Sequence, residues 1–377
     1  MSPNSTPLED SPAARRAGAI LSIDLDALAE NYGTLAGQAA RGVGCAAVVK
    51  VDAYGLGVER VAPVLIAAGC RQFFVAQLEE GIRLRGLLPE AEVHVLGGLL
   101  PGLESDFEAH GLTPTLNSLG EIEIWARHAR RQEQSLAADL HVDTGMRRLG
   151  LPPDELDRLA GEPERLAGID VALLISHLAC AEQRDHALNA GQLADFHQAR
   201  DRLPPAPASF ANSSGIFLGP DYHFDLLRPG VALYGANPTP DRETPMRPVV
   251  RLQGRIWQVR DARPGETVGY GATYEVTEPT RIATLALGYG DGHPRALGSR
   301  GEVFVGGQAA PVIGRISMDS TTIDVSGLPE GQVRPGTLVD VIGLNNPIDA
   351  VAASAGTVAY ELLTNLGRRY HRTYSGG

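Results

Sequence analysis

A lysine stands where an apolar run ends in the segment CAAVVKVDAYGLG, with a tyrosine and two glycines close behind it. Lys50 directly follows the run, and Tyr54 comes four residues later. Apolar surroundings disfavour the charged form of a lysine and lower its pKa, so that its amine can attack a carbonyl carbon and form an imine. A lysine that only lays its stem along an apolar surface is the alternative explanation of the same pattern.

Two arginines follow a second apolar run, in HVDTGMRRLG. Arg148 and its neighbour Arg147 come after a glycine turn, and a guanidinium group binds a carboxylate or a phosphate through two parallel hydrogen bonds. Two solvated arginines that open a helix would give the same pattern. A third run, in LISHLA, is followed by His177, a residue type that is more often structural than functional when it stands alone.

Small polar residues and glycine accompany two further runs. FANSSG places Asn212 and Ser213 at a turn from a strand to a helix, and LLRPGVALYG places Arg228 and Gly230 just before an expected strand. Hydroxyl groups and backbone N–H groups at such turns bind phosphate. Together with the lysine and the arginine pair, these segments predict a phosphorylated carbonyl cofactor that acts on an amino acid.

The element pattern between residues 18 and 245 explains how these segments would meet. Short apolar runs alternate there with longer stretches of helical spacing, such as QLEEGIRLRG. About eight strands alternating with helices are typical of a (β/α)₈ TIM barrel, in which the carboxyl ends of the strands carry the active site. A doubly wound sheet is the alternative, although no G-x-G-x-x-G follows the first strand. The expected strands lie at 45–50, 72–76, 92–96, 113–116, 137–143, 171–176, 208–212 and 231–235.

The pattern of residues changes on each side of this region. From 246 to 377 helical spacing nearly disappears and short strands alternate with Gly and Pro turns, which predicts a C-terminal all-β domain. One helical stretch, 348–366, closes the chain. Residues 1–17 have the composition of a disordered tail. The strand-like segment 19–28 is expected to pair with the C-terminal domain.

The composition limits the partners of the chain. The formal net charge of −12 argues against nucleic acid and anionic membranes as the main partners. The three cysteines show no C-x-x-C spacing, which argues against disulfides and against a zinc site, so no metal is expected. No apolar run reaches the roughly 18 residues of a membrane span, and the N-terminus lacks the pattern of an export signal. We therefore expect a cytoplasmic location.

The ordered motifs resemble those of the alanine racemase family, whose members are barrel enzymes that use pyridoxal 5′-phosphate and carry a C-terminal β domain. The resemblance runs from about residue 18 to 372 and begins with AVVKVDAYGLG. It continues in family order with VDTGMRRLG, SHLA, ANSSG, LRPGVALYG, GYGATY, GYGDGHPR, GRISMD and AYELL. The ordered series is far more specific than any one motif.

The resemblance implies a role for each matching residue. Lys50 carries the cofactor covalently, and Tyr270 of GYGATY is the second catalytic base. Arg228 faces the pyridine nitrogen of the cofactor, and His177 links Arg228 to Tyr270. Arg148 lies near the phenolic oxygen of the cofactor. The residues implied around the phosphate are Tyr54, Asn212, Ser213, Gly230, Val231 and Tyr360. Those implied at the substrate carboxylate are Arg148 and Met318, and those at the entrance are Tyr289, Arg295 and Arg315.

The implied reaction is the interconversion of L-alanine and D-alanine by two bases. The α-proton leaves from one face and a proton returns to the other, so Lys50 and Tyr270 would each act as a base in one direction and as an acid in the other. The family resemblance implies a head-to-tail homodimer in which each barrel uses the tyrosine of its partner. D-alanine would serve as a peptidoglycan precursor, or the enzyme would serve alanine catabolism.

Several positions depart from the family pattern, and in the opening motif Asp52 and Leu56 stand where other residues are frequent. His141 stands where many relatives carry a carbamylated lysine that supports the arginine corresponding to Arg148. Arg147 replaces a common glycine and Ser317 a frequent cysteine, and neither touches the proposed proton transfers. Histidine cannot supply the carbamylated group, so either another residue or an anion supports Arg148, or Arg148 is held more loosely.

Other functions are compatible with parts of the pattern. A racemase for serine or for several small amino acids is the nearest alternative, and Tyr289 and Tyr360 at the entrance favour a small side chain only weakly. A barrel-type amino-acid decarboxylase would share the cofactor, but its glycine-rich phosphate loop and its cysteine are not seen. A cofactor-binding protein without activity would need only the barrel, and the additional β domain argues against it.

Overall fold

The computed structural model describes residues 11–377, which form two units. The barrel unit consists of Ala29–Leu233 and Asn237–Met246. The β unit consists of Tyr234–Ala236 and Arg247–Gly377, together with the described residues up to Leu28. The domain boundaries proposed from the sequence at residues 17 and 245 stay predictions. None of the helices in the described range is long and apolar enough to cross a membrane.

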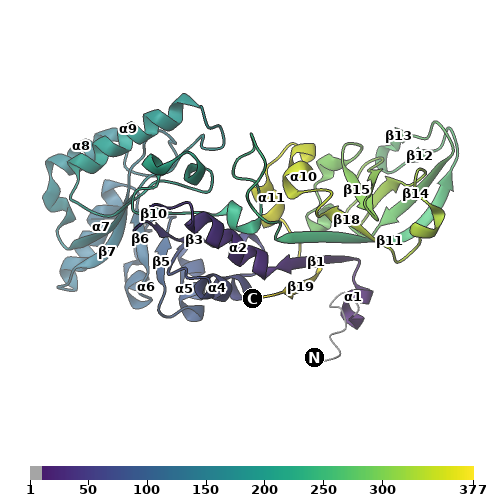
Figure 1. Cartoon of the computed structure of the whole chain (residues 1–377). Helices are drawn as coiled ribbons and strands as arrows, with labels where there is room; N and C mark the ends of the chain where they lie inside the picture. The colour runs from purple at the N-terminus through teal and green to yellow at the C-terminus, as the bar shows by residue number, and fades with distance from the viewer. Residues whose placement is uncertain (1–10) are drawn as a thin grey trace. The chain divides into compact units, whose positions relative to one another are not determined.

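Parallel strands build the barrel unit (Figure 1). A seven-stranded sheet has the order β3 to β9, and every neighbouring pair in it is parallel. The strands are β2 (Gly44–Cys45), β3 (Ala47–Val48), β4 (Gln72–Val75), β5 (Glu92–Val95), β6 (Thr113–Leu116), β7 (Leu136–His141), β8 (Ile169–Ile175), β9 (Ala208–Ser209) and β10 (Leu226–Leu227). Because one parallel sheet runs through consecutive strands, the predicted TIM-type fold is confirmed and the doubly wound alternative is wrong.

Strand β10 joins the two ends of this sheet. It pairs in parallel with β2, in register Leu226↔Gly44, and the N–H of Ala46 donates to the carbonyl of Leu227 at 2.9 Å. On its other side, the N–H of Arg228 donates to the carbonyl of Ala211 beyond β9, also at 2.9 Å. Backbone hydrogen bonds therefore continue around the barrel.

The sequence prediction misplaced the last barrel strand. The segment VALYG was expected to be that strand, but Val231–Tyr234 forms a 3₁₀ turn and the strand is β10 instead. β10 has only two residues, too few for a recognisable apolar run. The correction matters because Arg228 then directly follows a strand, at the end of the barrel where active sites form.

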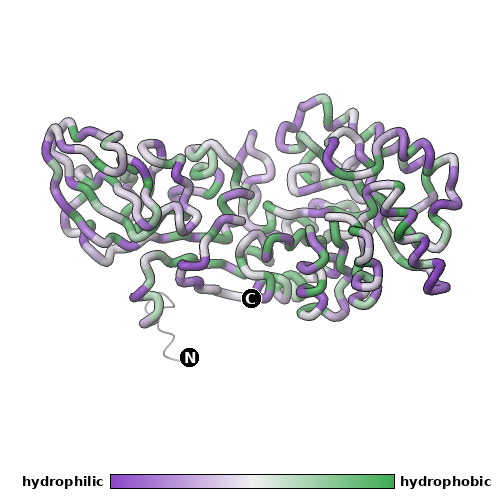
Figure 2. The backbone as a smooth tube through the Cα atoms, turned by 180° about the vertical axis from the view of Figure 1, so that it is seen from behind, coloured by the Kyte–Doolittle hydropathy of each residue, from purple (hydrophilic) through white to green (hydrophobic). Residues whose placement is uncertain are grey.

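Helices lie on the outside of the barrel strands (Figure 1). In α7, Ser118 accepts a hydrogen bond from the N–H of Glu121 as an N-cap, and the buried residues follow helical spacing. Hydrophobic segments gather along the interior strands, and hydrophilic ones along the outer helices (Figure 2). The helices are α2 (Leu25–Ala36), α4 (Val58–Ala67), α5 (Leu78–Leu87), α6 (Glu104–Ala109), α7 (Leu119–Arg131), α8 (Pro153–Gly161) and α9 (Ala187–Arg202).

The β unit is built around the long strand β11 (Val250–Ala262). β1 (Ala19–Asp24) pairs antiparallel with β11 and parallel with β19 (His371–Ser375), which confirms the expected pairing of the first strand with this domain. The sequence pattern did not predict β19. The other strands are β12 (Thr267–Val268), β13 (Tyr274–Glu275), β14 (Thr280–Leu285), β15 (Glu302–Val305), β16 (Gln308–Pro311), β17 (Thr321–Asp324) and β18 (Leu338–Ile342).

Short helices complete the β unit. The predicted helical stretch 348–366 is divided into α10 (Ile348–Ala355) and α11 (Ala359–Thr364), because Gly356 ends the first with a left-handed cap. At the other end of the chain, α1 (Pro12–Arg16) occupies part of the expected tail, and Arg255 donates hydrogen bonds to the carbonyls of Ala14 and Ala17 beside it. The rest of that tail, residues 1–10, lies outside the described residues.

Candidate active site at the ends of the barrel strands

A cavity of about 160 Å³ opens where the barrel strands end. It brings together four residues that the sequence singled out, and each follows a different strand. The lining residues are Lys50, Ala76, Leu96, Gly97, His141, Arg148, Leu149, Ile175, His177 and Arg228. Among the described residues, no group of three or more His, Cys, Asp or Glu side chains could hold a metal ion. The chemistry of this cavity therefore rests on a lysine, two arginines and two histidines.

Lys50 supplies the amine of the cavity. Burial lowers the pKa of its amine most, the charges of Arg148 and Arg228 lower it further, and only Glu80 opposes them. A lowered pKa increases the share of the neutral amine, the form that attacks a carbonyl carbon. The cavity thus gives Lys50 the property that the sequence pattern predicted.

The backbone after Lys50 forms a turn of the unusual hand, which we call the left-handed turn. Its four residues, Val51–Tyr54, have φ between 53° and 56°, and none of them is a glycine. Left-handed helical backbone costs L-residues roughly 1–2 kcal/mol each, so such a turn persists only where its surroundings hold it. Gly55 donates to the carbonyl of Val51 at 2.8 Å, and Gly57 donates to that of Asp52 at 3.0 Å. No sequence signal marked this turn.

Three of the residues predicted around a phosphate lie together. The Ser213 side chain is 2% exposed, and its Oγ accepts hydrogen bonds from the N–H groups of Gly230 (2.9 Å) and Ala232 (3.3 Å). A Cβ atom at residue 230 would lie 2.4 Å from the hydroxyl oxygen of Tyr54, so only glycine fits there. The two accepted bonds occupy both lone pairs of the Ser213 hydroxyl. Its proton has no acceptor among residues 11–377 and can be donated to an anion.

The two remaining phosphate candidates of the barrel lie at the edges of this group. Val231 is buried and begins the 3₁₀ turn that follows Gly230. Asn212 uses its Oδ1 to accept a hydrogen bond from the N–H of Gly215 at 2.9 Å, so it shapes the turn that presents Ser213. The geometry of these loops fits a bound phosphate through hydroxyl and backbone donors.

Arg228 is a buried cation with neutral acceptors. Its Nε donates to Ser209 Oγ at 2.7 Å, and its Nη2 donates to the backbone carbonyl of Ser176. Its guanidinium carbon lies 5.8 Å from the ring centroid of Phe74. Burial lowers the pKa of Arg228 to about 10, while the charge of Asp139 raises it. The side chain is therefore held rigidly, with one carboxylate acting on it from within the barrel.

That carboxylate belongs to a buried network that the sequence analysis missed. Asp139 has no exposed surface and accepts hydrogen bonds from Nδ1 of His94 (2.9 and 3.1 Å) and from Oγ1 of Thr115 (3.3 Å). The His94 ring stacks on Phe74, with 4.5 Å between centroids, and Phe74 in turn lies under Arg228. Burial lowers the pKa of His94, but Asp139 outweighs this and leaves it raised. Polar residues within the apolar runs EVHVL and AADLHVD were the one signal of this network in the sequence.

Neutral histidines line the cavity beside the two arginines. The pKa of His177 is well below its ordinary value because of burial and the charges of Arg228 and Arg148. Burial, with the charge of Arg228, lowers the pKa of His141 to about 4, and its Nδ1 lies 2.8 Å from Oδ1 of Asn117. Because the Asn117 amide nitrogen donates to the carbonyl of Thr115, its oxygen faces the histidine, which makes His141 Nδ1 the protonated nitrogen.

Arg148 is exposed and makes no hydrogen bond or ion pair with any residue in the described part of the chain. It shares the cavity with His141, and a protonated His141 would repel the guanidinium group of Arg148. A neutral His141 removes this repulsion. Its unprotonated Nε2 is an acceptor, so the residue that departs from the family pattern remains chemically compatible with a guanidinium group beside it.

The remaining candidates all belong to the β unit, where contacts bring together Arg315 with the turn of Tyr270 and Tyr289 with Met318. Arg315 packs on the turn that carries Tyr270, since a Cβ atom at residue 271 would lie 2.9 Å from its Nη1. The N–H groups of Tyr289 and Gly290 donate to the carbonyls of Ser317 (3.0 Å) and Met318 (2.8 Å), which places GYGDG beside RISMD. The exposed candidates of this unit are Tyr270, Tyr289, Arg295, Arg315, Met318 and Tyr360.

The fold and the cavity define a class: a TIM-barrel protein with a half-buried lysine at the strand ends, followed by a β domain. The model of the alanine racemase N-terminal domain matches residues 23–238, and that of the alanine racemase C-terminal domain matches residues 249–374. The chain belongs to the alanine racemase family, and it is a racemase.

Individual relatives agree with this assignment. The alanine racemase of Rhodospirillum rubrum is 50% identical over 362 residues, covering 96% of this chain and 97% of that protein. The catabolic alanine racemase of Agrobacterium fabrum is 50% identical over 363 residues, covering 96% and 93%. The crystal structure of alanine racemase from Bartonella henselae with covalently bound pyridoxal phosphate has a TM-score of 0.92 and 40% identity, and the match covers 95% of this chain and 100% of that one.

Proposed function

We propose that this chain interconverts L-alanine and D-alanine with pyridoxal 5′-phosphate held on Lys50. The observation that carries the proposal is the placement of a half-buried lysine of lowered pKa in one cavity with Arg228. The unused Ser213 hydroxyl proton and the close approach of Tyr54 to Gly230 suit the phosphate. When bound, the cofactor withdraws electrons from the α-carbon of the amino acid and so makes its α-proton acidic.

Lys50 and a tyrosine would move the proton. Lys50 Nζ takes or returns a proton at the α-carbon on one face, and Tyr270 Oη does so on the other, so that the two together invert the configuration. The lowered pKa of Lys50 brings its amine toward the working pH, which general acid–base catalysis requires. Each residue is the base for one enantiomer and the acid for the other.

The other residues of the cavity orient these groups. Arg228 keeps its proton and would face the pyridine nitrogen, while the neutral His177 would link it to Tyr270. Arg148 and the backbone of Met318 would bind the substrate carboxylate, Arg148 beside the phenolic oxygen of the cofactor. Tyr360 would join the phosphate group. Tyr289, Arg295 and Arg315 would line the entrance.

The exposure of Tyr270 supports a head-to-tail homodimer. Its side chain is 71% exposed in the single chain, which is unusual for a residue that must exchange a proton away from water. In the proposed dimer, the Tyr270 of one chain completes the barrel cavity of the other. Each active site then contains Lys50 from one chain and Tyr270 from its partner.

Mixing two inactive variants tests this arrangement. Lys50→Ala and Tyr270→Phe chains are unfolded and refolded together, so that about half of the dimers are hybrids with one intact site each, and about a quarter of the wild-type activity returns. Each variant refolded alone is the control. If both residues came from the same chain, every site of the mixture would carry a substitution and no activity would return.

A panel of L-amino acids tests the substrate. D-amino acid oxidase detects the product, and we expect L-alanine to be racemised fastest, with Lys50→Ala as the inactive control. If L-serine were racemised faster than L-alanine, serine would be the preferred substrate, and release of carbon dioxide would indicate decarboxylation.

In the cell, we propose that the enzyme acts in the cytoplasm on this small substrate, with no nucleic-acid or membrane partner. It would supply D-alanine for peptidoglycan or serve alanine catabolism.

A further inference from the structure

The left-handed turn after Lys50 has an anchor outside itself. The N–H of Val51, its first residue, donates to Oε1 of Glu80 at 2.6 Å. Glu80 lies in the first turn of α5, and its Oε2 accepts hydrogen bonds from the N–H groups of Ala76 (2.8 Å) and Gln77 (3.1 Å). One carboxylate therefore joins the segment that follows β3 to the segment that follows β4.

We propose that Glu80 is a positioning residue for Lys50, which it holds by clamping the left-handed turn to the end of β4. The inference rests on the proposed function, in which Lys50 is the cofactor lysine. Glu80 lies outside the cavity lining and does not touch the reacting atoms. It acts through the backbone that carries Lys50.

The geometry requires a carboxylate. Both oxygens of Glu80 act as acceptors, and together they bind three backbone N–H groups. A glutamine has one acceptor oxygen and an amide nitrogen that only donates, so it would leave at least one of these N–H groups facing another donor. An aspartate keeps both acceptors but is one methylene shorter, so it cannot reach both segments from the same helix position.

At this end the turn is otherwise supported by its own backbone, where the N–H of Ala53 donates to the carbonyl of Val49 at 2.9 Å and that of Gly55 to the carbonyl of Val51 at 2.8 Å. The side chain of Val51 is 45% exposed, so its packing contributes little. A second carboxylate, Asp52, anchors the far end, where its Oδ1 accepts from the N–H of Val58 at 2.9 Å and lies 3.2 Å from Arg83. Without Glu80, the residue directly after Lys50 would lose its anchor while the far end stayed fixed.

Glu80 also offsets the positive charges around Lys50. Arg148 and Arg228 both lower the pKa of Lys50, and Glu80 is the carboxylate among the described groups that raises it. His141 and His177 share the cavity, but the pKa of each is lowered and they are neutral. Removal of the Glu80 charge therefore moves the pKa of the Lys50 nitrogen further down.

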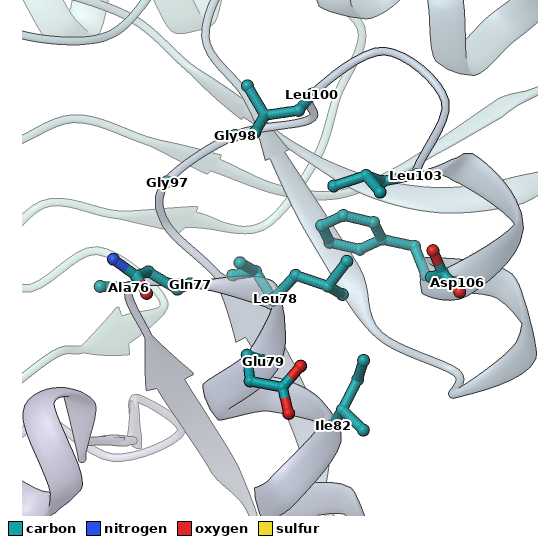
Figure 3. Close-up of a pocket in the computed structure, with 12 residues that line it drawn as sticks. Ala76, Gln77, Leu78, Glu79, Ile82, Gly97, Gly98, Leu100, Leu103 and Asp106 are labelled. Atoms are coloured by element: carbon teal, nitrogen blue, oxygen red, sulfur yellow. The ribbon is translucent and has the colours of Figure 1, made fainter.

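Glu79 provides a matched control. It is the preceding residue of the same helix turn and also a glutamate, but it is exposed and lines a groove of about 540 Å³ that shares Ala76 and Gly97 with the Lys50 cavity, whose lining does not include Glu79. Figure 3 shows Glu79 among the residues of this groove, together with Ala76 and Gln77, whose N–H groups donate to Glu80. Glu79→Gln and Glu80→Gln remove the same charge from the same helix end, and only the second removes the clamp.

The experiment compares the two variants as holoenzymes. For Glu80→Gln we expect kcat for alanine to fall by about 10- to 100-fold, with KM changed by less than about twofold, because the lysine is misplaced while the substrate contacts remain. The pH midpoint of the absorbance of the Lys50-bound cofactor should move down by about half a unit or more. Glu79→Gln should match the wild type in all three quantities.

A merely structural role of Glu80 would give a different result. Thermal unfolding of Glu80→Gln would then occur at lower temperature, with kcat and the absorbance midpoint unchanged, and this would overturn the proposal. If Glu80→Gln does not fold, Glu80→Asp replaces it: kcat should fall while the midpoint stays near that of the wild type, and an unchanged kcat would overturn the proposal. Absence of cofactor absorbance in the wild type would instead refute the proposed function.

Discussion

The candidate site residues of the barrel unit and those of the β unit differ in how far they are buried. Arg228 and Ser213 are 4% and 2% exposed, and each is fixed by hydrogen bonds to neighbouring strand ends. Tyr270 and Met318 are 71% and 55% exposed and lie on turns. The barrel unit encloses these two candidates, although its Arg148 is exposed, whereas the candidates of the β unit are exposed on its surface.

This difference in burial bears on how the proposed active site would exclude water. Proton transfer and charge stabilisation are more effective in an enclosed site than at a wet surface. The barrel supplies such surroundings to Lys50, but the β unit does not supply them to its own Tyr270. The proposed dimer accounts for the difference, because the exposed turn of one chain would be enclosed by the barrel of another.

Replacement of Lys50 tests the barrel half and has the largest expected effect. Lys50→Ala removes both the proposed attachment point and one of the two bases, so alanine racemisation should fall by about 10⁴-fold or more. A coupled assay with D-amino acid oxidase measures the loss. The protein should still fold, since the left-handed turn is held by backbone and carboxylate groups. Racemisation within about tenfold of the wild type would contradict the assignment.

Replacement of Tyr270 tests the β half. Tyr270→Phe should slow racemisation by about 10²- to 10⁴-fold, the range for loss of a general acid or base, without changing thermal stability. Deuterium exchange at the α-carbon should be lost chiefly for L-alanine. Tyr289→Phe is the control, because Tyr289 is also an exposed tyrosine of the β unit and is proposed only to line the entrance. An equal loss of racemisation rate in the two variants would contradict the assignment of Tyr270 as a catalytic base.

Acid should destabilise both units through buried histidines. Burial lowers the pKa of His141 in the barrel unit and of His293 in the β unit to about 4. The unfolded chain takes up a proton below about pH 6.5 while the folded one does not, so stability falls as the pH drops from about 6.5 to 4. Each histidine contributes on the order of 3 kcal/mol across that window. Urea unfolding at several pH values measures the effect.

A variant of His293 separates the two contributions. His293→Gln removes the titrating group of the β unit, so the unfolding free energy should depend less steeply on pH than in the wild type. The barrel contribution from His141 should remain. An identical slope in the variant would show that His293 is not held neutral by its burial.

The support of Arg228 has the smallest predicted effect. Ser209→Ala removes the acceptor of the Arg228 Nε and leaves that buried donor unsatisfied, which should cost about 1–3 kcal/mol of stability. Urea unfolding at pH 7 measures it. Ser354→Ala on the exposed side of α10 is the control and should change stability by less than about 0.5 kcal/mol. Equal stability of the two variants would mean that Ser209 does not hold Arg228.

Local patterns in the sequence were sufficient for much of the fold. Apolar runs followed by helical spacing predicted the barrel because each element is a few residues long and its period is visible locally. The same approach missed β10 and β19: β10 is only two residues long, and β19, HRTYS, carries little apolar signal. It also assigned Val231–Tyr234 to a strand, although the chain turns there to present Gly230.

The sequence by itself determined which residues follow several strand ends, and this was sufficient to single out Lys50 and His177 as functional candidates. Arg228 was also singled out, but as a residue before an expected strand, and the structure shows that it follows β10. It could not show the left-handed turn, because no glycine marks Val51–Tyr54. Nor could it show that Glu80 holds that turn from 29 residues away in the chain. The hand of the turn after Lys50, the burial of the site side chains and their pKa values depend on neighbours that only folding brings together. The tertiary structure alone decided these properties.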